Sequence, residues 1–427
     1  MYEPDTIAAI ATPPGRGGVA VVRVSGPEAF AIASRITGRM VGAADAGRFF
    51  HTTFHGGRSC SIDDGLVLVF ASPHSYTGED VVEFQGHGGS VAPRRVLEAV
   101  LSAGGRLAHR GEFTLRAFLN GRLDLSSAEA VIDLVDAKTS RAATDAVRRL
   151  HGGLKDVFEK FYASALELSA SVEHALDFSE DELPTDFADE IMADVETLAS
   201  AIRCHLSTAR EGKLLREGAL VVLAGPPNAG KSSLLNALLG EKRAIVSPCA
   251  GTTRDSIEEW LEIGGWPVRL TDTAGLRDTS DSIEAEGIER ARDLVSRADI
   301  VVALDCDVPG AIRVHAKCDL GPGDGLPVSS KTGEGLDGLK CAIAERLSNI
   351  SAKEEEGDGA DVTTRQKELL DVSLTVLSRA RDALAAPEWV LAAGELRACA
   401  EALGRLTGKV YSDDLLDSLF SRFCVGK

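Results

Sequence analysis

The chain has 427 residues, of which 44% are hydrophobic and 26% are charged, the proportions of an ordinary globular protein. A chain of this length is typical of about three domains, each large enough for its own core. The net charge of −19 excludes a protein that coats nucleic acid through a broadly basic surface. Any contact with RNA must therefore be local or made by a partner.

Three further features bear on the location of the protein. The first residues, Met1–Asp5, contain neither a basic region nor an apolar core, so we expect no signal peptide. No apolar run approaches the roughly 18 residues of a membrane span, and we expect a cytoplasmic protein. The cysteines include no C-x-x-C pair and no set of cysteines and histidines at the spacing of a metal site, which predicts reduced thiols and neither disulfides nor a cysteine-bound metal.

The first half of the chain divides into two compositions. Residues 1–118 mix short β-like runs with glycine turns, which predicts an α+β domain. Strands are expected at residues 7–11, 19–24 and 65–70. From residue 119 to 212 the pattern is helical, and Ser126-x-x-Glu129 predicts a capping box at a helix start. The acidic stretch 177–184 interrupts this pattern and predicts a solvated loop.

A phosphate-binding loop follows. Residues 219–224 are an apolar run that predicts a strand, and the segment from Gly225 to Ser232 fits G-x-x-x-x-G-K-[ST] at every fixed position. A helix with an apolar face comes next. Glycines let backbone N–H groups approach phosphates, Lys231 can neutralise their charge, and the Ser232 hydroxyl can bind magnesium. The order strand, loop, helix predicts a binding site for a nucleoside triphosphate.

Later segments predict that this nucleotide is GTP. Thr252 and Thr253 can reach a magnesium ion, and Asp272-Thr-Ala-Gly275 ends a predicted strand and can sense the γ-phosphate. Ala316-Lys-Cys-Asp319 and Ser329-Ser-Lys331 resemble the guanine-reading Asn-Lys-x-Asp and Ser-Ala-Lys motifs of the GTPase superfamily. The Asp would accept hydrogen bonds from the guanine N1–H and amino group. The alanine that replaces the usual Asn predicts weak nucleotide binding.

The predicted GTPase segment is short. Only ten residues separate Asp305 from Ala316, whereas a Ras-like domain places a helix between these two strands. Lys331 also follows Asp319 closely. We therefore expect a compact domain that lacks a peripheral helix.

The last part of the chain is again helical. Residues 353–359 predict a polar linker, and helical periodicity returns from Thr364 onward. Helical sequence on both sides of a self-contained α/β unit predicts one discontinuous helical domain with a GTPase inserted into it. We therefore expect a multidomain α+β and α/β protein with four segments: an N-terminal α+β domain (1–118), the first helical part (119–212), a compact Ras-like P-loop GTPase domain (213–350) and the second helical part (351–427).

Several segments besides the GTPase motifs point to one family. They are Ala11-Thr-Pro-Pro-Gly-Arg-Gly-Gly18, Phe84-Gln-Gly-His-Gly-Gly89, Gly111-Glu-Phe-x-x-Arg-Ala-Phe-Leu-Asn120, Leu123-Asp-Leu-x-x-Ala-Glu-Ala130, Ser412-Asp-Asp-Leu-Leu416 and Phe423-Cys-Val-Gly-Lys427. Through them the whole chain resembles the MnmE (TrmE) family of tRNA-modification GTPases. The resemblance implies an N-terminal domain that binds tetrahydrofolate and forms a homodimer, followed by the discontinuous helical domain and the inserted Ras-like domain.

The resemblance also implies a reaction. Family members work with an FAD-containing MnmG-type partner to add a carboxymethylaminomethyl or aminomethyl group to C5 of the wobble uridine of certain tRNAs. A 5-formyl- or 5,10-methylene-tetrahydrofolate supplies the carbon, and GTP hydrolysis drives a conformational cycle. The family's folate site corresponds to Arg23, Glu83, Arg122 and Lys427, with Arg122 where a lysine is usual. By their spacing alone, Arg23 and Glu83 are typical of plain surface charges.

For the GTP site, the resemblance implies a larger set of residues. They are Asn228, Ala229, Gly230, Lys231, Ser232, Ser233, Ser247, Thr252, Thr253, Asp272, Thr273, Ala274, Gly275, Lys317, Asp319, Ser329, Ser330 and Lys331. Magnesium would be held by Ser232 and Thr253. Leu276 stands where Ras-like enzymes have a glutamine that orients water. The resemblance implies instead that Glu284 orients the water through a bridging water. It also implies a potassium ion, which supplies the positive charge that an arginine finger supplies elsewhere. The potassium ligands would be Asn228, Ser247, Cys249 and Thr252.

The segment 423–427 is the last expected site. An apolar stripe at Leu415, Leu416, Leu419 and Phe420 would dock it against the helical domain, with Lys427 beside the folate pocket. Cys424 is either the nucleophile for a covalent one-carbon intermediate or a small packed thiol, because no His or Lys activator lies next to it in sequence.

Two other functions stay open on sequence grounds. A GTP-dependent assembly factor for ribosomes would need a basic RNA-binding appendage such as a KH domain, and none is visible. A stand-alone folate-dependent methyl or formyl transferase with a regulatory GTPase would bind tetrahydrofolate and need no flavoprotein.

Overall fold

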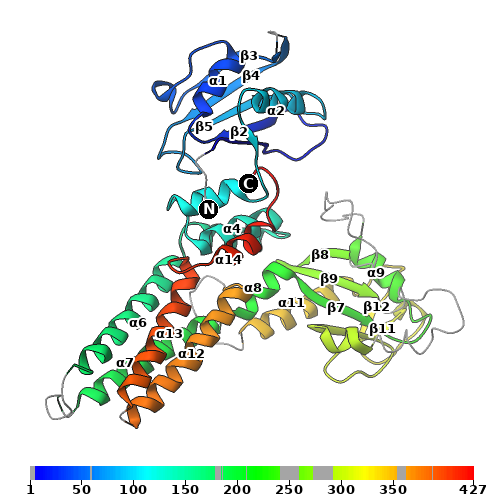
Figure 1. Cartoon of the computed structure of the whole chain (residues 1–427). Helices are drawn as coiled ribbons and strands as arrows, with labels where there is room; N and C mark the ends of the chain where they lie inside the picture. Colours follow the sequence, from blue (N-terminus) through cyan, green and yellow to red (C-terminus); the bar gives the residue numbers. More distant parts are fainter. Residues whose placement is uncertain are drawn as a thin grey trace, which may run out of the picture. The chain divides into compact units, whose positions relative to one another are not determined.

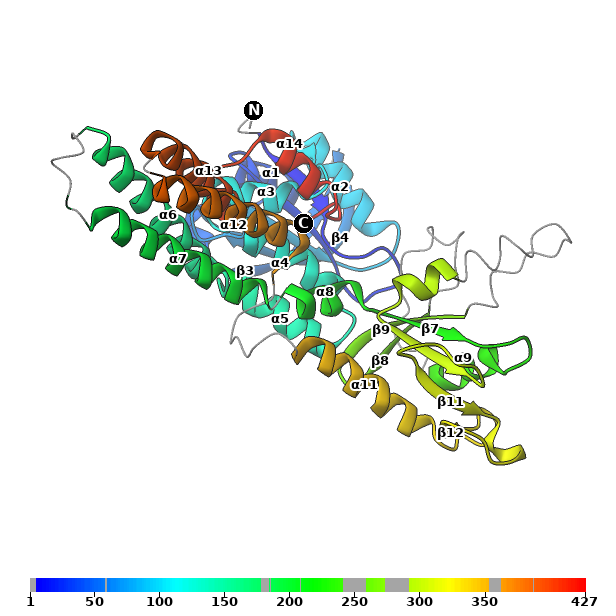
Figure 2. The ribbon, with the colours of Figure 1, turned by 90° about the horizontal axis from the view of Figure 1, so that it is seen from below.

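The computed structural model describes residues 5–57, 60–177, 184, 186–207, 209–240, 259–272, 292–352, 362–386 and 388–427. The chain forms two compact units, whose elements are drawn in Figures 1 and 2. Unit 1 comprises residues 1–132 and 404–427, and unit 2 comprises residues 133–403. In the described part of the chain, no helix combines the length and the apolar character that crossing a membrane requires.

Unit 1 is built on a six-stranded sheet with the order β3-β4-β5-β2-β1-β6. Its strands are β1 (Ile7–Ile10), β2 (Ala20–Ser25), β3 (Phe49–His55), β4 (Ser61–Phe70), β5 (Val81–Gly86) and β6 (Arg106–Leu107). All neighbours are antiparallel except β1 and β6, which are parallel. The strands predicted at 7–11, 19–24 and 65–70 are confirmed as β1, β2 and part of β4.

The two faces of this sheet have different neighbours. Val22 and Val24 of β2 belong to a core that also contains residues of helices α1 (Ala29–Thr37) and α2 (Ala92–Ser102). Arg23 stands between these valines, so side-chain alternation directs it to the opposite face. On that face, Phe113 of α3 (Glu112–Leu119) packs with residues of β1. The sheet therefore has one apolar face under α1 and α2, and one face that carries a charge.

The C-terminal helix α14 (Asp413–Phe420) also belongs to unit 1, where it lies against α3. Gly111, with φ +67°, makes this contact possible, because a Cβ there would lie 2.5 Å from the Phe420 carbonyl oxygen. The rings of Phe118 and Tyr411 meet edge to face with centroids 5.4 Å apart. Helix α14 and the residues after it contact α3, Arg110 and β1, so the docking expected against the helical domain also involves the N-terminal part of the chain.

Helix starts follow capping chemistry, with one departure from the prediction. Helix α4 spans Leu125–Asp136, and Ser126 is buried in its first turn and does not cap it. Asp124 takes the cap, because its carboxylate accepts from the Ser127 N–H at 3.0 Å and from the Ser127 hydroxyl at 2.7 Å. The predicted capping box at Ser126 is therefore wrong. A capping box does begin α12 (Thr364–Ala385), between Thr363 and Gln366, where the helical pattern was expected to resume.

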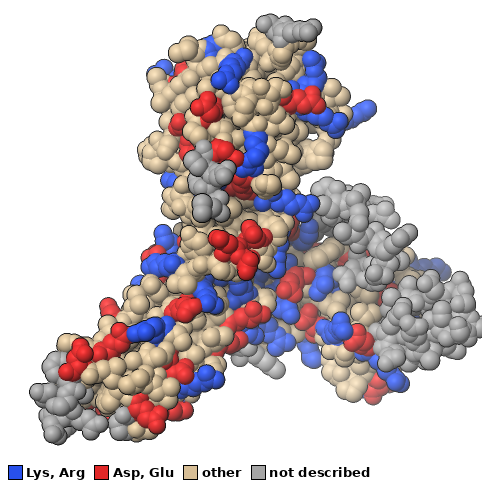
Figure 3. Space-filling view, viewed as in Figure 1, with Lys and Arg blue, Asp and Glu red and all other residues tan. Residues whose placement is uncertain are grey.

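Unit 2 contains a helical bundle. Helices α6 (Lys155–Ala175), α7 (Phe187–Leu206), α12 and α13 (Trp389–Thr407) lie side by side in both ribbon views (Figures 1 and 2). Helices α5 (Ser140–Leu150) and α8 (Ala209–Glu217) contribute Ala142, Leu214 and Leu215 to the core of the neighbouring sheet. Figure 3 shows acidic and basic side chains interspersed over the visible face of the bundle, so this face is not uniformly basic.

The second sheet, also in unit 2, has the order β12-β11-β10-β7-β9-β8. Its strands are β7 (Ala219–Ala224), β8 (Glu259–Ile263), β9 (Trp266–Asp272), β10 (Ile300–Leu304), β11 (Ile312–Ala316) and β12 (Leu326–Val328). Only β8 is antiparallel to its neighbour. Apolar residues of α9 (Lys231–Leu239) and α11 (Leu336–Ala352) pack with this sheet. The predicted strand at 219–224 and the helix after it are confirmed.

Two connections between parallel strands contain no α-helix. Residues 305–311 join β10 to β11, and residues 317–325 join β11 to β12 with only a 3-10 turn, η4 (Cys318–Leu320). Parallel strands are usually joined by about a dozen residues or more, most often an α-helix. The expectation that a peripheral helix is missing is confirmed, and within the described residues 292–352 it applies at both connections.

Candidate functional site

The phosphate loop joins the end of β7 to the start of α9. Gly225 (φ +158°) and Gly230 (φ +95°) have positive φ angles, and so does Asn228 between them (φ +63°). A Cβ on Gly225 would lie 2.7 Å from the Leu304 carbonyl oxygen, so the loop can pass this close to β10 only with glycine. The loop leads directly into the N-terminus of α9, where free backbone N–H groups can bind an anion.

Lys231 and Ser232 begin α9. Lys231 is only 6% exposed, and its Nζ donates to the carbonyl oxygens of Gly225 at 2.8 Å and Pro226 at 2.9 Å. The Ser232 hydroxyl donates to Asp272 Oδ2 at 2.6 Å. Hydroxyl and carboxylate oxygens are the ligands that Mg²⁺ prefers, directly or through water. These side chains therefore fit a magnesium–triphosphate complex, with Lys231 set against the phosphates.

The base-reading segments lie against the same loop. Lys317 donates from Nζ to the Asn228 carbonyl oxygen at 2.9 Å. A hydrogen bond from Ser329, with nearby Lys331 and Lys317, holds the pKa of Asp319 below its ordinary value. An ionised Asp319 is the acceptor that the guanine N1–H and amino group require. Asp319 lines a hollow of about 590 Å³ together with His315 and Glu334.

The other described residues of the expected GTP site fall on the same elements. Ala229 is buried in the phosphate loop, and Ser233 is exposed on α9. Ser330 follows Ser329 after β12, and the backbone N–H of Lys331 donates to the Ser329 hydroxyl at 3.3 Å. The remaining expected residues lie outside the described residues: Ser247, Cys249, Thr252, Thr253, Thr273, Ala274, Gly275 and Glu284. The potassium site and the role of Glu284 therefore stay predictions.

Unit 1 carries a second cluster of expected residues. Arg23 of β2 and Glu83 of β5 are direct partners in the sheet, and Arg23 Nε donates to Glu83 Oε1 at 2.8 Å. Their side chains are 20% and 15% exposed, which separates the pair from ordinary surface charges. The Arg23 guanidinium also lies 5.3 Å from the ring centroid of Tyr76 and 5.6 Å from that of Phe113. Charge and aromatic surface are thus combined on one face of the sheet.

Arg122 joins this cluster through the loop 75–78. Its Nε donates to the Ser75 carbonyl oxygen at 3.2 Å. Its side-chain stem lies against Gly78, where an added Cβ would be 3.1 Å from Arg122 Cγ. Tyr76, in the same loop, contacts Arg23 and exchanges a hydrogen bond of 2.8 Å with Thr114. The structure therefore brings Arg23, Glu83 and Arg122 together around one loop.

The tail reaches the same sheet through β1. Gly426 lies against Ile10, and Val425 forms an antiparallel bridge with Arg110. The N–H groups of Gly111 and Lys427 both donate to the Cys424 carbonyl oxygen at 3.4 Å. Cys424 itself is exposed, so it is not a buried packing residue, and Lys427 is half-buried.

Comparison with known proteins agrees with this arrangement. A family model described as the MnmE helical domain matches residues 125–424, and one described as the GTP-binding protein TrmE N-terminus matches residues 6–122. Among relatives named tRNA modification GTPase MnmE, the protein of Symbiobacterium thermophilum is 44% identical, with 99% of both chains covered. That of Dichelobacter nodosus is 44% identical over the whole of both chains. The chain belongs to the MnmE family.

Arg23, Glu83, Arg122 and Tyr76 form what we call the Arg23 cluster. In this MnmE family member, a buried charge network in the same unit was not predicted from sequence. Arg116 of α3 is 1% exposed and contacts Asp5 at 2.5 Å, Glu79 at 3.2 Å and Glu112 at 3.0 Å. Glu79 also accepts from the hydroxyl of Ser25, at the end of β2, at 2.6 Å. The signal was present in the segment Gly111-Glu-Phe-x-x-Arg, because an acid and a base four residues apart meet on a helix.

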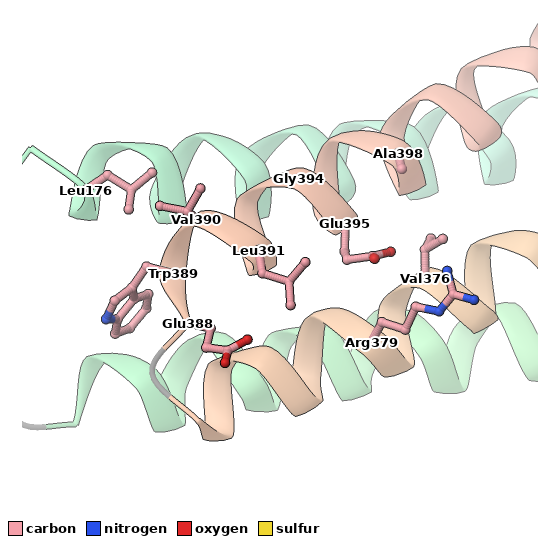
Figure 4. Close-up of a pocket in the computed structure, with 10 residues that line it drawn as sticks. All are labelled: Leu176, Val376, Arg379, Glu388, Trp389, Val390, Leu391, Gly394, Glu395 and Ala398. Atoms are coloured by element: carbon pink, nitrogen blue, oxygen red, sulfur yellow. The ribbon is translucent and has the colours of Figure 1, made fainter.

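A groove of about 920 Å³ on the helical bundle shares no residue with either cluster. Figure 4 shows its lining on α12, on α13 and at Glu388 between them, with Leu176 from the end of α6. The lining is mainly apolar, as at Leu176, Val376 and Leu391, with charges at Arg379 and Glu395. The residues that line it include no histidine, cysteine, serine or threonine, and we assign the groove no part in the reaction.

Proposed function

We propose that this chain hydrolyses GTP and, with an FAD-containing MnmG-type partner, adds a carboxymethylaminomethyl or aminomethyl group to C5 of the wobble uridine of certain tRNAs. Membership of the MnmE family over the whole chain carries the proposal. The phosphate loop and Asp319 support its GTPase part, since Lys231 offers a cation for phosphate, Ser232 a hydroxyl for magnesium and Asp319 a carboxylate for guanine.

In the GTPase step, the residues of unit 2 bind and orient the nucleotide. Lys231 would neutralise charge on the β- and γ-phosphates, and Ser232 with Thr253 would hold magnesium. Potassium, when bound by Asn228 and residues of segment 247–252, would supply the positive charge that an arginine finger supplies elsewhere. Glu284 would orient the attacking water through a second water, since Leu276 has no group that can do so.

In the modification step, the Arg23 cluster would bind a 5-formyl- or 5,10-methylene-tetrahydrofolate, which supplies the one-carbon unit. The cluster fits this ligand by its chemistry. Arg122 and Lys427 are cations for the glutamate carboxylates of folate, and Glu83 is an acceptor for the N–H groups of the pterin. Tyr76 and Phe113 offer aromatic surface for a flat ring. Cys424, exposed on the tail, is available as a nucleophile.

The assembly that we propose is a cytoplasmic homodimer. Residues 1–118 would form the folate-binding and dimerising domain, residues 119–212 and 351–427 the helical domain, and residues 213–350 the GTPase domain. Pairing of two chains through residues 1–118 would let two GTPase domains meet when GTP and potassium are bound.

The test is nucleoside mass spectrometry of tRNA from a strain that lacks this gene, complemented with the intact chain or with Arg23→Ala. We expect the deletion to remove the wobble-uridine group, the intact chain to restore it, and Arg23→Ala to fail. Unchanged tRNA together with a ribosome-assembly defect would refute the proposal in favour of an assembly factor. Full modification without the flavoprotein would favour a stand-alone transferase.

A further inference from the structure

The segment around Asp319, which is expected to read the base, is not held in place by a neighbouring crossover helix. Asp319 is followed by residues 321–325, which lead into β12 without an α-helix. The loop after β10, residues 305–311, has no α-helix either. In a parallel sheet, a crossover helix packed on the strands normally fixes the loops at their carboxyl ends. Another element must therefore hold these two loops.

His315 of β11 connects them. Its Nδ1 lies 3.1 Å from Asp305 Oδ1, at the start of the first loop, and its Nε2 lies 2.9 Å from the Gly321 carbonyl oxygen, in the second. The same Asp305 oxygen accepts from the backbone N–H of Ala316 at 3.2 Å. An added Cβ on Gly323 would lie 2.3 Å from the ring, so the second loop passes directly over the imidazole.

The chemistry of these two contacts favours the protonated ring. A carboxylate and a carbonyl oxygen are both acceptors, so both ring nitrogens must donate, and only the imidazolium carries two N–H groups. The hydrogen bond to Gly321 and that to Asp305 raise the pKa of His315 above its ordinary value. A neutral ring would leave one nitrogen lone pair facing an oxygen lone pair, and one loop would lose its attachment.

The surroundings favour the charged ring. Groups of the sheet end, the second loop and the segment after β12 face or surround it: Asp305, Asp307, Asp319, Asp324, Glu334, Cys318 and Arg313. Five of these are acidic, and Arg313 is paired with Asp307. Two lysines, Lys317 and Lys331, lie near Asp319 and lower its pKa. The ring side chain is 19% exposed, so its charge is partly shielded from water.

We propose that the His315 imidazolium is a positioning residue for the base-reading loop. It holds the two loops that lack crossover helices and thereby sets the affinity for guanine nucleotides. The inference rests on the proposed GTP binding of this site. The folded pKa lies above the value of about 6.5 of a free imidazole, so the attachment is complete below about pH 6.5. It is lost as the pH rises through the folded pKa, and nucleotide affinity falls with it.

The test is the Kd for GDP of the full chain and of His315→Gln, measured by calorimetry at about pH 6 and about pH 9. We expect the variant to bind about threefold to tenfold more weakly than the intact chain at the lower pH, and equally at the higher pH. Protonation of the GDP phosphates affects both proteins alike. At each pH, the ratio of the Kd of the variant to that of the intact chain therefore reports the contribution of the His315 ring. A ratio near one at both values refutes the inference.

Two variants make the outcome specific. Gly323→Ala leaves the titrating ring in place but obstructs its contact with the loop, so it should reproduce the loss at low pH. His87→Gln is the matched control in unit 1, because the exposed His87 ring is also paired with a carboxylate, Asp63, at 2.7 Å. It should leave both Kd values unchanged, and an equal effect of His87→Gln would contradict the assignment to His315.

A further measurement separates this inference from the proposed function. Asp319→Asn should weaken GDP binding at least about tenfold and favour xanthosine diphosphate, whose base exchanges donor and acceptor at the position that Asp319 reads. If the intact chain binds no guanine nucleotide, the proposed function fails. If it binds GDP and responds to Asp319→Asn but not to His315→Gln or Gly323→Ala, only the inference fails.

Discussion

Replacing Gly426 by alanine should detach the last residues of the sequence from unit 1. The residue has φ +101°, and an added Cβ would lie 2.6 Å from the Ile10 carbonyl oxygen and 3.0 Å from Ala11 Cα. Both neighbours are backbone atoms, so no side chain can rotate to make room. A strained backbone angle costs an alanine about 1–3 kcal/mol, and overpacking costs about 1–3 kcal/mol more.

A combined cost of about 3 kcal/mol weakens docking of the tail about a hundredfold. We expect carboxypeptidase to trim the variant faster than the intact chain, and tRNA modification with the flavoprotein partner to fall accordingly. GTP hydrolysis should stay unchanged, because the phosphate loop belongs to unit 2.

Gly38→Ala is the control. Gly38 has φ +67° and no atom lies near the position of an added Cβ, so this substitution strains the backbone without causing overlap. If the Gly426→Ala variant were trimmed, and modified tRNA, at the same rates as the intact chain, the reasoning would be refuted.

Three further predictions concern the GTPase cycle and the assembly. Exchanging potassium for sodium should cut GTP turnover severely, and Asn228→Ala should abolish the stimulation; equal rates in both salts would contradict the potassium site. Glu284→Ala should keep its affinity for GTP while kcat falls by about 10² to 10⁴, and either normal turnover or loss of binding would show the assignment to be wrong. Light scattering of the full chain at micromolar concentration should give twice the 45.0 kDa of one chain, and a monomer would count against pairing through residues 1–118.

The parts of the molecule that the sequence predicted are those fixed by local rules. Glycines at 225 and 230 dictate the phosphate loop, because only the backbone angles that they allow bring N–H groups together. The missing crossover helix could be inferred from chain length alone, since ten residues between Asp305 and Ala316 leave no room for it.

The features that could not be predicted depend on local backbone geometry or on contacts between residues far apart in the sequence. The apolar stripe of α14 indicates that it is buried but not against what, and the contact at Gly111 decides this in favour of α3. At the start of α4, Asp124 and Ser126 both have capping chemistry, and only the backbone geometry selects Asp124. Likewise, the sequence of β11 shows only alternating polar and apolar residues. The role of His315 becomes visible only in the structure, where Asp305 and Gly321 lie beside its ring.

Unit 1 is assembled from the two ends of the sequence, with residues 404–427 completing a body begun by residues 1–132. On the ribosome, these two parts are separated by the roughly 270 residues of unit 2, which at 5–20 residues per second take about 15 to 50 s to make. Unit 2 is continuous and can fold as it emerges. The strands of the unit 1 sheet all lie within residues 7–107, so the sheet can also form early, but its contacts with α14 and the last residues must wait. An interrupted translation product would therefore retain the GTPase module but lack the segment that carries Cys424 and Lys427. Under the proposed function, such a product could hydrolyse GTP but could not complete the proposed folate site.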